Sequence, residues 1–110
     1  MSKLGTPRVR VPARAKRGEV FEIRAMVEHP MESGFRLDNV GKPIARHIAE
    51  SFSCTYDGHE VFRATLHPAV STNPYFVFTA LATVSGEVRF EWTDDQGGHV
   101  THVSKIDVEA

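Results

Sequence analysis

The sequence predicts an all-β protein, an immunoglobulin-like antiparallel β-sandwich of about seven strands. Apolar residues recur at every second position along most of the chain, which is the period of a half-buried strand. Turn signals separate these segments at short intervals, as in sandwich folds. The length of 110 residues suits a single domain spanning 1–110. The cysteine pair of true antibody domains is absent, because Cys54 is the only cysteine.

The first two strands are predicted where apolar residues alternate with charged ones. Val9 and Val11 alternate with arginines, and the segment 21–28 runs from Phe21 in the same alternating way. The sequence Lys16-Arg17-Gly18-Glu19 supplies the turn between them.

The segment 48–66 predicts a β-hairpin, with a helical turn near Ile44 as the alternative because Pro43 suits a helix start. A two-residue loop at 57–58 would set Phe52 against Arg63. A three-residue loop, Asp57-Gly58-His59, sets Phe52 against Ala64, Cys54 against Phe62 and Glu50 against Leu66. The second register keeps apolar residues on one face, so it predicts a glycine-bulge hairpin.

The remaining strands follow from three further segments. Residues 75–81 form a continuous apolar run that is short enough for a buried strand. Val88, Phe90 and Trp92 alternate with charged residues, and the segment 100–108 closes the chain. Turns are predicted at Ser85-Gly86 and Gly97-Gly98.

The charge distribution limits the partners that the sequence suggests. The formal net charge is −1, but six Lys and Arg precede Gly18 and no acidic residue precedes Glu19. No aromatic residue lies among these cations, so we expect a solvated first strand and no nucleic-acid partner. No apolar run approaches the ~20 residues of a membrane helix, and the first residues lack a hydrophobic signal-peptide core.

Residues that could carry chemistry are few. Cys54 lies mid-strand on the face of Phe52, so we expect a buried, inert thiol with a raised pKa. His29, His47, His59 and His67 fall in loops or at strand ends, where we expect them to be solvated. His99 and His102 lie three apart, which on a strand sends them to opposite faces. We therefore expect no metal, no cofactor and no catalytic residue, and a hairpin turn at Asp94-Asp95-Gln96-Gly97-Gly98.

Two long connections interrupt the strand pattern, over residues 29–43 and 67–74. Loops of the first one's length are uncommon in a compact domain and are often functional or covered by a partner. The alternative is that its apolar residues, Met31, Phe35, Leu37 and Val40, pack under the edge of the sandwich.

Three stretches of the sequence resemble the SoxZ family, the small subunits of the SoxYZ sulfur carrier in bacterial thiosulfate oxidation. They are His29-Pro30-Met31-Glu32-Ser33-Gly34-Phe35-Arg36, His67-Pro68-Ala69-Val70-Ser71-Thr72-Asn73-Pro74-Tyr75-Phe76 and Glu91-Trp92-Thr93-Asp94-Asp95. The likeness extends over nearly the whole chain, and the second stretch is specific.

The resemblance implies a subunit that pairs with SoxY, which in that family carries the sulfur substrate on a cysteine in a Gly-Gly-Cys-Gly-Gly tail. This chain ends Ile106-Asp107-Val108-Glu109-Ala110, without such an arm, so we expect the partner of the carrier. The resemblance further implies transient contacts with other Sox proteins and a periplasmic location reached with a signal-bearing partner. The alternatives are a thiol-based carrier or enzyme using Cys54, or a generic β-sandwich interaction module.

The partner-binding residues are expected in the two long connections, because apolar loop residues and arginines are typical interface anchors. They are Met31, Phe35, Arg36, Asn73, Tyr75 and Phe76.

Overall fold

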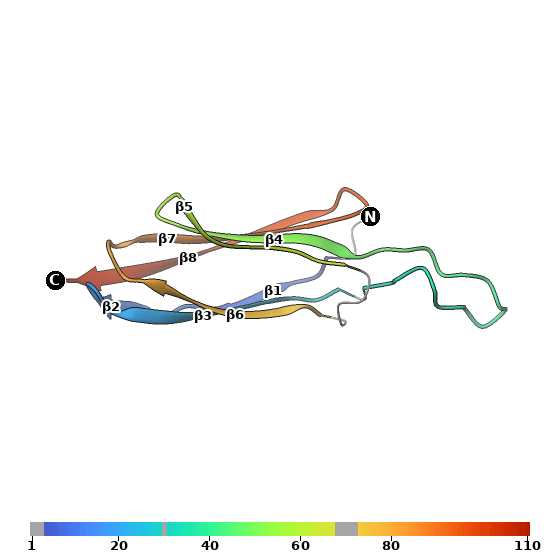
Figure 1. The fold of residues 1–110 in the computed structure, drawn as a ribbon, viewed down its shortest axis with the longest axis horizontal. Coiled ribbons are helices and arrows are strands. Elements are labelled where there is room, and N and C mark those ends of the chain that lie inside the picture. Colours follow the sequence, from blue (N-terminus) through green and yellow to red (C-terminus); the bar gives the residue numbers. More distant parts are fainter. Residues whose placement is uncertain (1–3, 30, 68–72) are drawn as a thin grey trace.

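Eight strands form two facing sheets in the computed structural model, which describes residues 4–29, 31–67 and 73–110 (Figure 1). No helix occurs in these described ranges, so none is available there to span a membrane. The all-β prediction is confirmed. The strands are β1 (Pro7–Arg10), β2 (Arg14–Lys16), β3 (Val20–Val27), β4 (Ala49–Tyr56), β5 (His59–Thr65), β6 (Tyr75–Leu81), β7 (Gly86–Asp94) and β8 (His99–Glu109).

The two sheets differ in size. One has the order β1-β3-β6 and the other the order β2-β8-β7-β4-β5. Strand β2 was not predicted, and it pairs with β8 in parallel, whereas the other strand pairs are antiparallel as expected. Its register sets Arg14 beside Asp107 and Lys16 beside Glu109. This pairing brings the basic start of the chain against its acidic end.

The β4–β5 hairpin has the expected register beyond Cys54, but its turn differs from the predicted one. Phe52 pairs with Ala64 and Cys54 with Phe62, as predicted. The turn, however, has two residues, Asp57 and Gly58, whose φ angles of 51° and 80° suit a type I′ turn. After Cys54 the register shifts, because β5 contains one extra residue between Glu60 and Phe62. This bulge restores the pairing that was expected from a three-residue loop.

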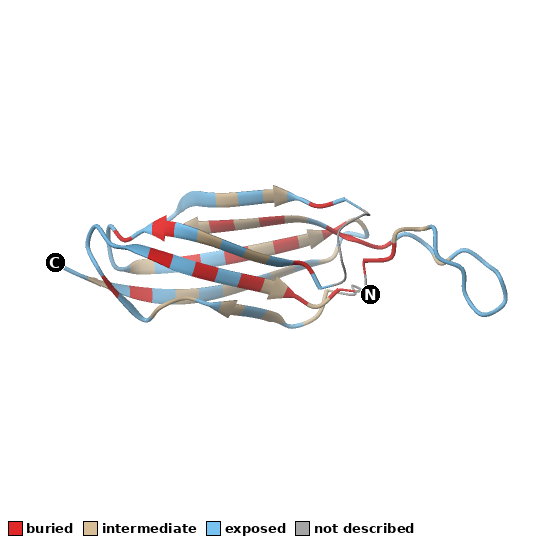
Figure 2. Cartoon of the chain, turned by 60° about the horizontal axis from the view of Figure 1, so that its bottom comes forward, coloured by how far each residue is buried: buried red, intermediate tan, exposed pale blue. Residues whose placement is uncertain are grey.

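The core lies between the sheets and is built from the alternate residues that the sequence pattern selects. Strands carry buried and exposed residues in turn, which Figure 2 shows as stripes. Phe52 is fully buried at its centre and contacts rings from both sheets. Its centroid lies 4.7 Å from that of Phe76, with the rings stacked, and 5.0 Å from that of Trp92. Aromatic packing therefore joins β4 and β7 to β6 across the sandwich.

Candidate functional site

A long hairpin-shaped loop projects from the end of the sandwich opposite the C-terminus (Figure 1). We call residues 33–46 the tongue. A backbone bridge between Glu32 and His47 closes its base, with N···O distances of 2.8 and 2.7 Å. Ile44 N–H donates to Arg36 O at 2.8 Å further out. The tongue is thus an extension of the chain with its own hydrogen bonds, and it contributes to a longest molecular dimension of 61 Å.

The tip of the tongue is a turn organised by Asp38. Its Oδ1 accepts hydrogen bonds from the backbone N–H groups of Val40 and Lys42, each at 2.9 Å. Gly41 has a φ of 83°, which a residue without Cβ adopts at no steric cost. Asp and Gly at these positions explain why the sequence turns here.

The tongue exposes three apolar side chains. Phe35 is 87% exposed, Val40 77% and Leu37 57%. Figure 2 shows the tongue as an almost wholly exposed segment beside a striped, half-buried sandwich. Singly exposed apolar residues are ordinary, but three on one narrow projection are typical of a surface that a partner covers. The alternative that the apolar residues of this connection pack under the edge of the sandwich is therefore wrong for Phe35, Leu37 and Val40.

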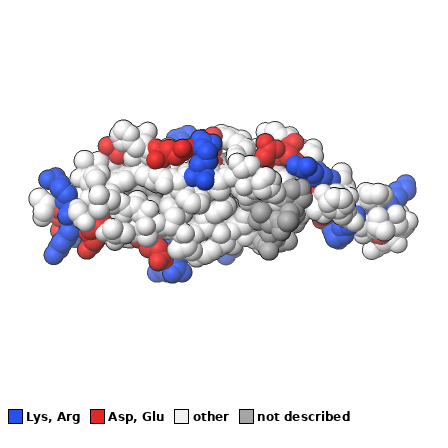
Figure 3. Space-filling model, viewed as in Figure 1, with Lys and Arg blue, Asp and Glu red and all other residues white. Residues whose placement is uncertain are grey.

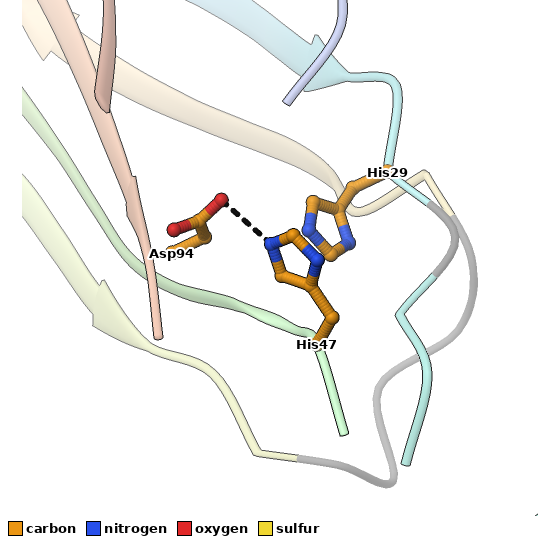
Figure 4. Close-up of side chains that lie close together, drawn as sticks. All are labelled: His29, His47 and Asp94. Carbon is orange, nitrogen blue, oxygen red and sulfur yellow. Dashed lines mark hydrogen bonds and ion pairs between the residues drawn. The ribbon is translucent and has the colours of Figure 1, made fainter. Parts of the chain in front are cut away.

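The base of the tongue is fixed by a buried polar cluster, His29, His47 and Asp94, which we call the clamp (Figure 4). His47 Nε2 lies 2.9 Å from Asp94 Oδ2. The second carboxylate oxygen, Asp94 Oδ1, accepts from the backbone N–H groups of Gln96 and Gly98 in the β7–β8 turn. One carboxylate therefore holds both the tongue and the neighbouring hairpin turn, which confirms the turn expected at Asp94-Asp95-Gln96-Gly97-Gly98.

His29 connects the two long connections of the sequence. Its backbone N–H donates to Asn73 Oδ1 at 2.8 Å, and its carbonyl accepts from Asn73 N–H at 2.9 Å. Its Nδ1 accepts from Met31 N–H at 2.9 Å. The His29 and His47 rings then meet edge to face with centroids 4.9 Å apart. Both histidines are buried, so the expectation that they are solvated is wrong.

The clamp offers three metal-ligand atoms within 4.8 Å of one another. A metal-bound histidine normally donates its second ring N–H to an oxygen. Nδ1 of His29 instead accepts from Met31 N–H, which can only donate, so this ring is neutral with its proton on Nε2. A metal at Nε2 would need that proton on Nδ1, against a second donor. The geometry thus favours a hydrogen-bonded structural clamp.

Asp95 completes the attachment of the tongue. Its carboxylate accepts from Ile48 N–H and from Arg46 Nε, each at 3.0 Å. Asp94 and Asp95 belong to the third of the stretches on which the SoxZ resemblance depends, and His29 and Asn73 belong to the other two. Residues as far apart in the sequence as His29 and Asp95 therefore meet at one end of the sandwich, where the tongue begins.

The six residues predicted to bind a partner all lie at this end, but they differ in accessibility. Phe35 and Arg36 are exposed on the tongue, and Arg36 pairs with Glu32 through two guanidinium nitrogens. Tyr75 and Asn73 are exposed beside it. Met31 is buried, with its sulfur near Ala49 N at 3.2 Å, and thus anchors the tongue.

Phe76 points into the core, where it stacks on Phe52. Leu37 and Val40 are exposed on the tongue but were not predicted as interface residues. An apolar residue among the turn-forming residues Asp, Asn and Gly would have indicated an exposed apolar side chain at these positions.

Cys54 is fully buried in β4, as expected. Burial disfavours the charged thiolate and raises the pKa of Cys54 from its ordinary 9.0 to about 12. The thiol is therefore neutral near pH 7 and is poorly placed for carrier or nucleophilic chemistry.

The raised pKa of Cys54 predicts a loss of stability in alkali. A folded state with the higher pKa holds the proton more tightly, so this contribution is complete below pH 9 and disappears as the pH rises toward about 12. Between about pH 8 and about pH 10.5, wild type should lose about 2 kcal/mol of unfolding free energy that a Cys54→Ala variant does not lose.

Urea unfolding at several pH values measures the difference between the two proteins, and parallel curves would contradict it. Iodoacetamide supplies a second measurement, since it should modify Cys54 only after denaturation.

The chain is similar to known proteins both in sequence, through a family match, and in fold. The model of the family "Sulphur oxidation protein SoxZ" matches residues 9–105. A search among curated sequences finds no match. The superoxide reductase (neelaredoxin) from Ignicoccus hospitalis has a similar fold, with a TM-score of 0.73, 18% identity and coverage of 96% of this chain and 82% of that one.

Two further solved structures share the fold. A putative superoxide reductase from Thermotoga maritima has a TM-score of 0.69 at 20% identity, covering 96% of this chain and 87% of that chain. The sulfur carrier protein SoxY from Chlorobium limicola f thiosulfatophilum has a TM-score of 0.67 at 12% identity, covering 94% and 79%. The structural similarities, at these low identities, show the sandwich fold alone. The family match covers nearly the whole chain and includes all of the tongue and the clamp. The chain therefore belongs to the SoxZ family of sulphur oxidation proteins.

Proposed function

We propose that this protein is the non-catalytic scaffold subunit of a SoxYZ-type complex, which binds a SoxY-like carrier and helps to present its bound sulfur intermediate to the other Sox enzymes. The observation that carries the proposal is the tongue, which exposes three apolar side chains at the end where the family's motif stretches meet. We call the SoxY-like protein the carrier partner. Periplasmic location is part of the proposal and is checked by cell fractionation against a cytoplasmic marker.

The chemistry of the described residues supports a scaffold role. The one thiol is buried with a raised pKa, and the clamp residues are occupied in joining the tongue to the β7–β8 turn. A mobile arm that carries a reactive thiol between several enzymes needs a rigid body to hold it. Backbone ladders, the aromatic core and the clamp give this chain that rigidity.

The affinity for the carrier partner should depend on the tongue. Phe35→Ala removes the most exposed aromatic ring and should weaken binding at least tenfold, or about 1.4 kcal/mol, because aromatic anchors dominate interface energies. Isothermal titration of the purified chain with the carrier partner measures this change.

Val103→Ala is the matched control, since Val103 is 41% exposed in β8, a strand of the other sheet. Equal affinities for both variants would contradict a tongue interface. Intact-mass analysis of the complex after thiosulfate loading gives the complementary result, with added mass expected on the carrier partner, and added mass on this chain would refute the scaffold role.

A further inference from the structure

The four edge strands of the two sheets are unlike one another. Proteins protect exposed sheet edges with charges, proline or shortness, because an open row of N–H and C=O groups pairs with other strands. Strand β1 carries proline and two arginines, β2 has three residues with two charges, and β5 carries Glu60 and Arg63. Strand β6, with the sequence YFVFTAL, has seven residues and neither charge nor proline. It is thus the edge left without these protections among the described strands.

The side chains of β6 are divided between the core and the surface. Phe76 and Phe78 point inward, and the Phe78 ring stacks on Phe62 with centroids 4.4 Å apart. Tyr75, Val77 and Leu81 are each about half exposed, at 53%, 52% and 52%. Figure 3 shows this side of the molecule as a broad uncharged band with charges along its margins. The strand is therefore held rigidly from inside and presents an apolar row outside.

The backbone register shows which β6 groups point to the open edge. Pro74 O accepts from Val27 N–H, and Ala82 N–H donates to Glu19 O at 2.8 Å, so even-numbered residues bond to β3. In an antiparallel ladder the intervening residues direct their N–H and C=O groups away from that partner. These are Tyr75, Val77, Thr79 and Leu81.

We propose that the open edge of β6 receives an extended strand of the carrier partner, so that the three-stranded sheet continues into the partner by β-strand addition. This inference rests on the proposed function and specifies its geometry. The partner's chemistry is a row of backbone N–H and C=O groups flanked by uncharged side chains. The solved SoxY has a similar sandwich fold, and an open sandwich ends in edge strands that can pair with another strand.

The position of β6 relative to the tongue favours this occupant. Tyr75 begins β6 two residues after Asn73, which bonds to His29 at the base of the tongue. The tongue and β6 follow one another along the long axis of the molecule (Figure 1). A partner bound to the tongue is thus aligned to extend along the edge of β6.

Hydrogen exchange of the β6 amides tests the proposal directly, because strand addition should protect alternate residues only. In the ¹⁵N-labelled chain, binding of unlabelled carrier partner should slow exchange of the Tyr75, Val77, Thr79 and Leu81 amides at least tenfold. The Phe76 and Phe78 amides already bond to β3 and should change little. Equal protection along β6, or none, would overturn strand addition even if the carrier partner binds.

Variants at Val77 provide the second test. Val77→Pro removes an edge-facing N–H without breaking the β3 ladder, and should weaken carrier binding at least tenfold while the melting temperature stays close to wild type. Val77→Ala keeps the N–H and should weaken binding less than threefold. Wild-type affinity of Val77→Pro would overturn the inference and leave the proposed function standing, whereas failure of the wild type to bind would refute the proposed function. A self-dimer that Val77→Pro dissociates would assign the edge to a second copy and overturn the choice of partner.

Discussion

Phe52→Ala is expected to lower the free energy of unfolding by about 4 kcal/mol. Phe52 is fully buried, and its ring centroid lies within 6.3 Å of five other aromatic ring centroids drawn from β5, β6 and β7. Truncation removes the apolar burial and leaves a cavity that residues from two sheets would have to fill together. Since small domains have about 5–15 kcal/mol of stability, this variant is expected to be close to unfolding.

Urea denaturation followed by Trp92 fluorescence measures this loss. Val61→Ala in β5 is the control, because Val61 is 36% exposed and lies one residue from the same cluster. Its effect should stay within about 0.5 kcal/mol, as for most surface substitutions. A loss below about 2 kcal/mol in Phe52→Ala would show that the aromatic cluster is not the centre of the core.

Asp94→Ala should destabilise the protein by about 3 kcal/mol, because it removes one carboxylate from three buried or half-buried donors. His47 loses its acceptor inside the protein, and the N–H groups of Gln96 and Gly98 lose theirs. The loss should begin locally, so the amides of the tongue base should exchange faster than those of β8. Thermal unfolding together with hydrogen exchange measures both effects.

Asp107→Ala supplies the control for the removal of a carboxylate, since Asp107 is exposed on β8. Asp94→Asn retains an oxygen for the N–H groups of Gln96 and Gly98, so its loss of stability should fall between those of Asp94→Ala and Asp107→Ala. If Asp94→Ala unfolds like Asp107→Ala, the clamp does not stabilise the tongue, and the attachment would depend on the Glu32–His47 backbone bridge and Asp95.

Most of the strands were predictable because each has a buried face that the alternation of residues reveals, and β6 was predicted from its continuous apolar run. The hairpin register followed from keeping Phe52 and Cys54 on the same side as Ala64 and Phe62. The bulge in β5 was not predictable, because an extra residue in the ladder and an extra residue in the loop give the same pairing beyond it. Strand β2 was missed for another reason: three residues are too few to show a period, and its partner strand, β8, lies more than ninety positions away in the sequence.

The candidate site could be located from the sequence but not described in detail. Loop length and the SoxZ resemblance single out the segments that meet at the base of the tongue, and Phe35, Arg36 and Tyr75 are exposed there. That these residues bind a partner stays a prediction. Met31 belongs to the core, because an apolar residue in a loop has no period to show whether it faces inward. The clamp was hidden because His29, His47 and Asp94 come from three distant segments, and only the fold brings them together.

The tongue has a consequence for how such proteins change during evolution. Its exposed residues bury little apolar surface against their own domain, so their substitution is expected to change the stability of the fold only slightly. The core and the clamp lie elsewhere and constrain different positions. Under the proposed function, partner choice and foldability are encoded in separate parts of the chain, which would allow the tongue to follow changes in its partner while the body stays under independent selection.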